Sequence, residues 1–220
     1  DSVYIGLGGK SGELFDDFWE YNAKNNQWLK IAPFPGAARI SAVGFSIGNE
    51  GYIVTGRDAG SKNLKECWSY TPGDDIWKQK AEFPGRNRYR ATGVSHNGEG
   101  YVGLGRGATA YFQDFYKYNP IEDAWTKIAN YPGVGRNSAF GFIFKGLAYI
   151  GAGQSNGNTA EASVYTYDPI SGEWKKFDDI PEAFYNGIGV ANSEIAIIGM
   201  GNISIAIDGT TVWEIDIPRP

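Results

Sequence analysis

The sequence has few cysteines and histidines, the residues that form the disulfides of small folds and bind metal ions. Its 220 residues include one cysteine, Cys67, and one histidine, His96. A lone cysteine cannot close a disulfide within the chain, and zinc sites need several cysteine or histidine ligands. No apolar run approaches the roughly 18 residues of a membrane-spanning helix. We therefore expect no metal, no cofactor and no membrane span.

Positive charge is also scarce. Twenty Lys and Arg residues face 25 Asp and Glu residues, which gives a formal net charge of -5. Nucleic-acid-binding domains are usually basic, so we expect no nucleic-acid partner. No signal peptide is visible, but the chain starts with aspartate, so a removed leader remains open.

What the sequence has in abundance is glycine and aromatic residues arranged in a repeat. The segment "QWLKIAPFPG" at Trp28 returns as "IWKQKAEFPG" at Trp77, "AWTKIANYPG" at Trp125 and "EWKKFDDIPE" at Trp174, at intervals of 49, 48 and 49 residues. Upstream of it, "DFWEYN" and its counterparts place a second aromatic residue at Trp19, Trp68, Tyr116, Tyr165 and Trp213. All seven tryptophans occupy repeated positions. The period near 48 residues indicates a repeat architecture.

Each repeat predicts four short strands. The first strand is an alternating run, expected at 38–48, 88–95, 136–144 and 184–191. The second is the Gly-containing run such as "GYIVTGRD", and the third holds the second aromatic residue. The fourth begins at the repeated tryptophan. Alternation of apolar residues with Gly, Asn and Asp punctuation is typical of strands joined by tight turns.

One such sheet cannot bury both faces, whereas sheets stacked around an axis can. We expect the tryptophans to lie between successive sheets, where an indole buries about 150–250 Å². The pattern of glycine, aromatic-x-Tyr, Asn/Asp-Pro turn and Trp resembles the kelch repeat of β-propellers. It is especially similar to kelch-type propellers of secreted Bacteroidetes-like bacterial proteins. The resemblance covers the whole chain and implies an all-β propeller of four-stranded antiparallel blades.

The predicted fold is one domain, 1–220, with five visible repeats. Their approximate ranges are 1–36, 37–85, 86–133, 134–182 and 183–220. They contain 18 predicted strands, because the first repeat lacks its inner strand and the last its outer strand. Five imperfect blades, a piece of a longer propeller, and self-association through open blade edges all remain open. The prolines of "IPRP" at 217–220 would blunt an exposed edge.

The up-and-down order of the strands predicts which loops share a face. Seven of the eight arginines fall on the face that holds the entrance to each first strand: Arg39, Arg57, Arg86, Arg88, Arg90, Arg106 and Arg136. The ligand-binding candidates on this face are Arg39, Arg57, Arg88, Arg106, Arg136 and Tyr185. Tyr89 and Tyr111 could add stacking surfaces. Arginine forks suit carboxylate and phosphate. The competing interpretation of Arg39, Arg88 and Arg136, which are equivalent in the repeat, is structural pairing with nearby carboxylates and carbonyls.

Catalytic chemistry has little support. Copper oxidases of the kelch type need two histidine ligands, and this chain has one histidine. No catalytic residue is therefore predicted. We expect a non-catalytic binding module for an acidic peptide or carboxylated glycan. The resemblance implies an extracellular, periplasmic or cell-surface location. The alternative is a carbohydrate-processing enzyme, such as a sialic-acid mutarotase-like protein, with Arg88, Arg136 and Glu82 as candidates.

Overall fold

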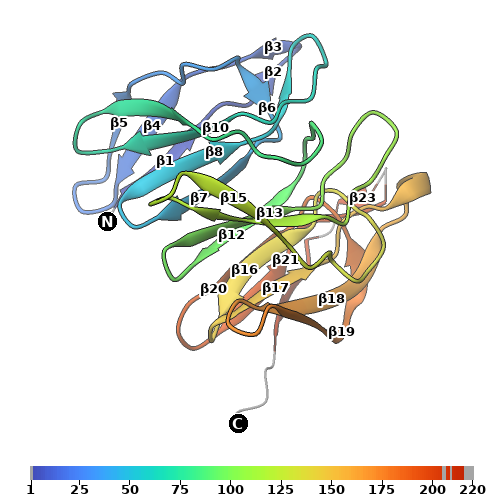
Figure 1. Ribbon diagram of the computed structural model, residues 1–220. Coiled ribbons are helices and arrows are strands. Elements are labelled where there is room, and N and C mark those ends of the chain that lie inside the picture. The colour runs from blue at the N-terminus through green and yellow to red at the C-terminus, as the bar shows by residue number, and fades with distance from the viewer. Residues whose placement is uncertain (1, 205–206, 209, 216–220) are drawn as a thin grey trace.

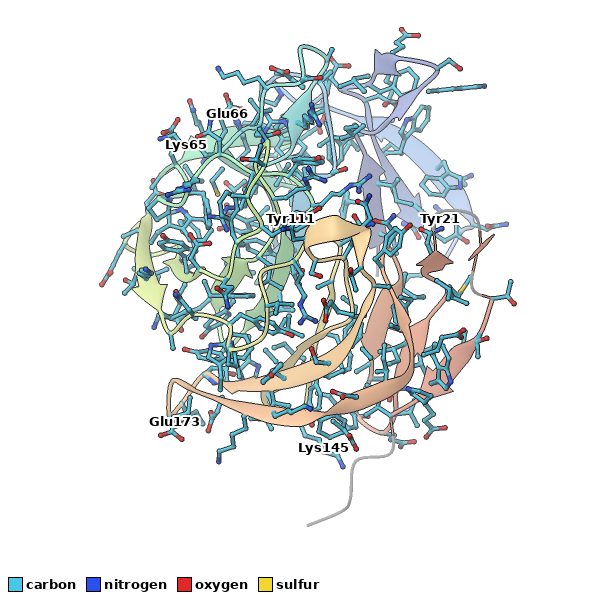
Figure 2. The ribbon with its side chains drawn as sticks, turned by 90° about the vertical axis from the view of Figure 1, so that its right-hand side faces the viewer. Tyr21, Lys65, Glu66, Tyr111, Lys145 and Glu173 are labelled. Atoms are coloured by element: carbon cyan, nitrogen blue, oxygen red, sulfur yellow. The ribbon has the colours of Figure 1, made fainter. Side chains whose placement is uncertain are left out.

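The computed structural model describes residues 2–204, 207–208 and 210–215, and these form a β-propeller. Five antiparallel sheets follow one another in chain order, and we call them blades 1 to 5 (Figure 1). In the view turned by 90° from Figure 1, the blades surround a common centre, and the first and last blades both lie on the right (Figure 2). The "IPRP" segment lies outside the described residues. Among the described residues, no helix has the length and apolar character needed to cross a membrane.

The five sheets hold eighteen strands within the described residues, as the repeat predicts. Blade 1 consists of β1 (Ser2–Gly6), β4 (Phe18–Asn22) and β5 (Gln27–Ile31). Blade 2 consists of β7 (Val43–Ile47), β8 (Glu50–Val54), β10 (Cys67–Thr71) and β11 (Ile76–Lys80). Blade 3 consists of β12 (Thr92–His96), β13 (Glu99–Gly103), β14 (Phe115–Asn119) and β15 (Ala124–Ile128).

Blade 4 has four strands, and blade 5 has three within the described residues. Blade 4 consists of β16 (Phe140–Phe144), β17 (Leu147–Gly151), β18 (Glu161–Asp168) and β19 (Glu173–Phe184). Blade 5 consists of β20 (Ile188–Ala191), β21 (Ala196–Gly199) and β24 (Val212–Glu214). Three short ladders lie outside the blades, formed by β2 (Gly9–Lys10) with β3 (Glu13–Leu14), β6 (Arg39–Ile40) with β9 (Arg57–Asp58), and β22 (Asn202–Ser204) with β23 (Ile207–Asp208). A single 3-10 turn spans Asn156–Asn158.

The inner strands start later than the sequence predicts. Each expected run is interrupted by one residue in the left-handed region, with φ between 53° and 56°, at Ser41, Arg90, Ser138 and Asn186. A left-handed residue breaks the extended ladder. The segment before the break therefore leaves the blade and pairs instead with the loop after the second strand, as Tyr89 does with Arg106. The prediction of continuous strands over 38–48, 88–95, 136–144 and 184–191 was wrong at these entrances.

The layers between blades are aromatic. The ring of Trp77 lies 4.8 Å from Phe18 and 5.2 Å from Phe34, both contributed by blade 1 or its exit. Its Nε1 donates to the carbonyl oxygen of Ala32 at 3.0 Å. Trp125 donates to Ala81 and Trp174 to Ala129 in the same way. Each of these three indoles thus joins its own blade to the preceding one.

The other repeated aromatic residues follow the same layers. Tyr116 packs on Phe83, Tyr165 on Tyr131, and Trp213 stacks on Phe184. Trp68 contacts Phe34. In blade 1, Trp19 is 37% exposed and Trp28 is 53% exposed. Among the described residues no sheet covers their side of the blade, so these two indoles remain at the surface.

Candidate functional site

The inner strands of blades 2 to 5 surround a narrow central space. Its volume is about 290 Å³, and its walls come from β7, β12, β16, β20 and the residues just before them. Small residues such as Ala42, Ala91, Ala139 and Gly187 line one end. The four left-handed residues stand immediately before this lining, at the face where sequence reasoning places the arginines.

Backbone hydrogen bonds fix this entrance. The N–H of Arg90 donates to the carbonyl of Ser41 at 2.9 Å, and its own carbonyl accepts from Ser138 at 3.0 Å. The N–H of Asn186 continues the series to Ser138 at 3.1 Å. Because these bonds run from blade to blade, the positions of the entrance residues relative to one another are set by the main chain.

The three repeat-equivalent arginines lie beneath this entrance, fully buried. Arg39, Arg88 and Arg136 each have 0% exposure. In each, Nε donates to the carbonyl two residues earlier and Nη1 to the carbonyl sixteen residues later. For Arg88 these acceptors are Arg86 at 3.0 Å and Leu104 at 2.8 Å. The same geometry recurs at Arg39 and Arg136.

Each buried arginine also lies near a carboxylate and packs against an aromatic ring. Arg88 makes a two-pronged contact with Asp114, at 2.7 and 2.8 Å. Its guanidinium carbon lies 4.7 Å from the centre of the Phe83 ring. Arg39 pairs with Glu66, which is labelled in Figure 2, and lies over Phe34.

Arg136 differs in its acid. Its Nη2 donates to the Ser163 hydroxyl at 2.9 Å, and the carboxylate of Glu161 is 3.8 Å away. Its guanidinium lies over the Tyr131 ring.

This geometry favours the structural interpretation of the three arginines. Their donors point to carbonyls and carboxylates of the protein itself, and no part of the side chain reaches the surface. Tyr185, another ligand-binding candidate, is 8% exposed and pairs through its backbone with Asn202. These four candidates are thus placed in the interior, whereas Arg57 and Arg106 are partly exposed.

Arg57, Arg90 and Arg106 converge on one ring, and we call these three residues the arginine cluster. Their guanidinium carbons lie 5.0, 5.7 and 5.8 Å from the centre of the Tyr89 ring. Arg106 also lies 4.9 Å from the Tyr111 ring and donates to its hydroxyl at 3.2 Å. Tyr111 lies near the middle of the view in Figure 2. The structure thus brings together side chains from the loops after β8 and β13 and from the entrance to β12.

The cluster carries positive charge without a matching acid. None of its three arginines forms an ion pair with any carboxylate in the described part of the chain. Arg57 donates to the Ser61 carbonyl at 3.2 Å, and Arg106 to the Ala108 carbonyl at 3.2 Å. A guanidinium has five N–H groups, so donors remain for an anion. Like charges held this close raise the local positive potential within an acidic protein.

Arg90 is not among the ligand-binding residues predicted from the sequence. It lies on the predicted face, but its three counterparts in the repeat are Ser41, Ser138 and Asn186. The available signal was this departure from the repeat: a charged residue where the other copies have short polar ones. Tyr89, expected as a stacking surface, is 9% exposed and forms the floor of the cluster.

The other residues with possible chemical roles, Cys67 and Glu82, are not part of the arginine cluster. Cys67 is buried in blade 2, and this burial, with the nearby charge of Asp123, raises the pKa of its thiol to about 12. No group of three or more potential metal ligands occurs among the described residues. Glu82 pairs with Lys65 at 2.6 Å, and both side chains are exposed.

Comparison with known proteins supports the fold. No family model matches the sequence, and no curated protein sequence does. Among solved structures, the one titled "Structure of YjhT" superimposes with a TM-score of 0.78 at 18% sequence identity, over 91% of this chain and 70% of that one. At this level of identity the likeness shows the β-propeller fold and leaves the activity to the geometry of the site.

Proposed function

We propose that this kelch-type propeller is a non-catalytic binding module that takes an acidic ligand, a carboxylated glycan or acidic peptide segment, at the arginine cluster. The observation that carries the proposal is the convergence of three guanidinium groups on Tyr89 with no carboxylate partner in the described residues. Planar carboxylates accept two parallel hydrogen bonds from a guanidinium, which matches the unused donors here. An extracellular, periplasmic or cell-surface location belongs to this proposal and rests on the sequence resemblance.

The cluster has the position and support that a binding site needs. It lies at the central face, where loops from two blades meet, and the backbone bonds of Arg90 fix its place. The Tyr111 ring offers an apolar surface beside Arg106. A ligand with a carboxylate and a flat or ring-shaped apolar face would use both features.

A glycan and peptide array probed at low and high salt tests the proposal. Binding should be confined to acidic glycans or peptides and should weaken as salt rises, because screening reduces attraction between charges. The Arg106→Ala variant should lose the signal. Arg86→Ala is the matched control, since Arg86 is an exposed arginine on the same face whose side chain lies over Phe112 instead. Binding of neutral ligands that is indifferent to salt would contradict the proposal.

The alternative function is that of an enzyme acting on an acidic sugar, such as a sialic-acid mutarotase-like protein. The cluster would hold the sugar carboxylate in that case as well. The residues that the sequence suggests for this enzymatic chemistry lack a suitable placement, because Arg88 and Arg136 are buried and Glu82 is paired with Lys65. Interconversion of sialic acid anomers, followed by proton nuclear magnetic resonance with and without protein, separates the two functions. Catalysed exchange that Arg106→Ala abolishes would favour the enzyme.

A further inference from the structure

The arginine cluster has an uncharged counterpart two blades further along the chain. Each of its arginines is replaced there by an amide around an equivalent tyrosine, and the matched positions are Arg57 with Gln154, Tyr89 with Tyr185, Arg90 with Asn186 and Arg106 with Asn202. The backbone confirms the match. Tyr185 exchanges two hydrogen bonds with Asn202, at 3.0 and 2.7 Å, as Tyr89 does with Arg106. Asn186 has a φ of 56°, and Arg90 has a φ of 53°.

The backbone also places Gln154 beside Tyr185. The N–H of Gly153 donates to the carbonyl of the residue before Tyr185 at 2.7 Å. The same bond between blades 2 and 3, at 3.1 Å, accompanies the contact of Arg57 with the Tyr89 ring. Because the two bonds are equivalent in the repeat, Gln154 stands to Tyr185 as Arg57 stands to Tyr89.

The side chain of Gln154 is largely buried and unpaired. The residue is 6% exposed. Its hydrogen bonds within the described part of the chain, all with Asn137, use backbone atoms of Gln154 and leave its carboxamide without a partner. A carboxamide with so little exposure has lost most of its hydration, which costs free energy unless a bound group replaces it. Two N–H donors and a carbonyl acceptor are thus offered to a ligand.

Asn186 supplies a second amide next to it. Its backbone N–H donates to the carbonyl of Ser138 at 3.1 Å, and its Nδ2 donates to the Oδ1 of Asn202 at 3.1 Å, so its position is fixed. The side chain is exposed, and one N–H and the carbonyl oxygen of its carboxamide remain for a ligand. We call Gln154 and Asn186 the amide pair. Neither residue carries charge, in contrast to the arginine cluster.

A single backbone residue joins the two places. Ser138 donates to the carbonyl of Arg90 at 3.0 Å and accepts from the N–H of Asn186 at 3.1 Å. Neighbouring hydrogen-bonded chains lie about 4.8 Å apart, so two such steps separate Arg90 from Asn186 by about 10 Å. The hydroxyl of Ser138 donates to Asn137 at 2.8 Å, and its side chain is short. A ligand of two adjoining sugar units can therefore contact both places.

We infer that the ligand is an acidic oligosaccharide, with its acidic unit on the arginine cluster and the neighbouring neutral sugar unit on the amide pair. The inference rests on the proposed function and decides between its two ligand classes. Sugar hydroxyls both donate and accept hydrogen bonds, and a carboxamide provides both partners. A run of acidic peptide residues would instead place a further carboxylate beside Gln154 and Asn186, which have no charge to match it.

Titration calorimetry with matched compounds tests the inference. The compounds are glucuronic acid and galacturonic acid, each free and linked to a neutral hexose, together with tetraglutamate. The linked sugars should bind about tenfold more tightly than the free acids, since they add hydrogen bonds at the amide pair. Tetraglutamate should bind no better than the free acids.

Two variants assign the difference to the amide pair. Gln154→Met keeps an unbranched side chain of similar size without donors or acceptors, and Asn186→Ser introduces the residue that Ser138 already holds in the left-handed conformation. Each should weaken binding of the linked sugars about fivefold, the usual effect of one neutral hydrogen bond, and leave binding of the free acids unchanged. Asn156→Ala, which removes an exposed amide from the same loop as Gln154, is the matched control and should change neither affinity.

Arg106→Ala separates this inference from the proposed function, because it should abolish binding of free and linked acids alike. The inference is overturned if the free acids or tetraglutamate bind as tightly as the linked sugars. It is also overturned if both amide-pair variants bind the linked sugars as the parent does. In either case binding that Arg106→Ala abolishes would leave the proposed function standing, whereas absence of binding by every compound would overturn both.

Discussion

Two sets of arginines, assigned to one face of this propeller by the repeat, differ in their burial and in their partners within the fold. Arg39, Arg88 and Arg136 are buried, and each donates to at least two carbonyls and to an acid or hydroxyl of the protein. Arg57, Arg90 and Arg106 are partly exposed, lie around Tyr89 and pair with no described carboxylate. The face of a repeat protein on which a residue lies is therefore a poor guide to its role. The partners that each guanidinium already has within the fold are the better guide, and the predictions below test them.

The largest expected effect is the loss of folding stability when a buried arginine is replaced. Arg88→Ala should lower the free energy of unfolding by about 3–5 kcal/mol, because it leaves Asp114 and two carbonyls without their buried partner. Arg136→Ala should cost less, since Glu161 is 3.8 Å away and Ser163 takes the place of the close carboxylate. Urea denaturation of both variants checks this order. A loss below about 0.5 kcal/mol for Arg88→Ala, the range of ordinary surface substitutions, would remove the distinction.

For the exposed arginines we expect the opposite pattern, a loss of ligand affinity with little loss of stability. Arg57→Ala and Arg106→Ala should each reduce affinity for the acidic ligand by about tenfold to a hundredfold, the effect of one charged hydrogen-bonding group. Their unfolding free energies should stay within about 0.5 kcal/mol of the parent. Titration calorimetry with the best array ligand, alongside urea denaturation, measures both. Equal losses of stability and affinity would mean that these residues also act through the fold.

A smaller effect is expected at Arg90, for which the repeat itself supplies the replacement. Arg90→Ser introduces the residue that Ser41 and Ser138 already place in the same left-handed conformation, so the backbone should tolerate it. Affinity should fall severalfold, and its dependence on salt should become shallower because one charge has left the site. Titrations at two salt concentrations test this, and an unchanged slope would exclude Arg90 from the site.

The smallest expected effect concerns Asp123, a carboxylate whose hydrogen bonds are made to other parts of the fold. Asp123 accepts from the N–H of Ala81 in the preceding repeat at 2.9 Å. Burial favours a higher pKa for Asp123, but this bond, the Tyr118 hydroxyl and the Lys80 charge outweigh it and lower the pKa below its usual value.

A carboxyl with a lowered pKa in the folded state stabilises fully above its unfolded-state pKa. The contribution disappears as the pH falls through the folded-state value. The stability deficit of Asp123→Ala should therefore be constant near neutrality and shrink below about pH 4. Urea denaturation at several pH values measures this, with Glu122→Ala as the exposed neighbouring control. A deficit that persists unchanged in acid would contradict the role of the charged form.

The blades were predictable from the sequence because their signals are periodic. The tryptophan spacing, the alternating runs and the turns of "NAKNNQ" type indicated eighteen strands, with no inner strand in the first repeat and no outer strand in the last. The described residues hold eighteen strands in the five blades, with three in blade 1 and three in blade 5. The entrance to each inner strand was mispredicted. "RISAVGF" alternates like a strand, and nothing in its composition marks Ser41 as left-handed. That conformation is imposed by hydrogen bonds to the next blade, which a single segment does not reveal.

The site was only partly predictable for a related reason. Sequence position brought all seven arginines to one face, but depth within that face depends on tertiary partners. Arg88 is drawn inward by Asp114, which lies 26 residues away in the chain. Arg106 instead meets Tyr111 in its own loop and stays near the surface. Equivalence in the repeat identified the buried set correctly as a group and could not assign its role.

Arginine modification followed by mass spectrometry tests the division most directly, in the unmodified chain and without knowledge of the ligand. Native protein treated with phenylglyoxal should react at Arg57, Arg90 and Arg106, while Arg39, Arg88 and Arg136 stay protected until urea unfolds the chain. Reaction of the second group in the native protein, at the rate of the first, would contradict the account.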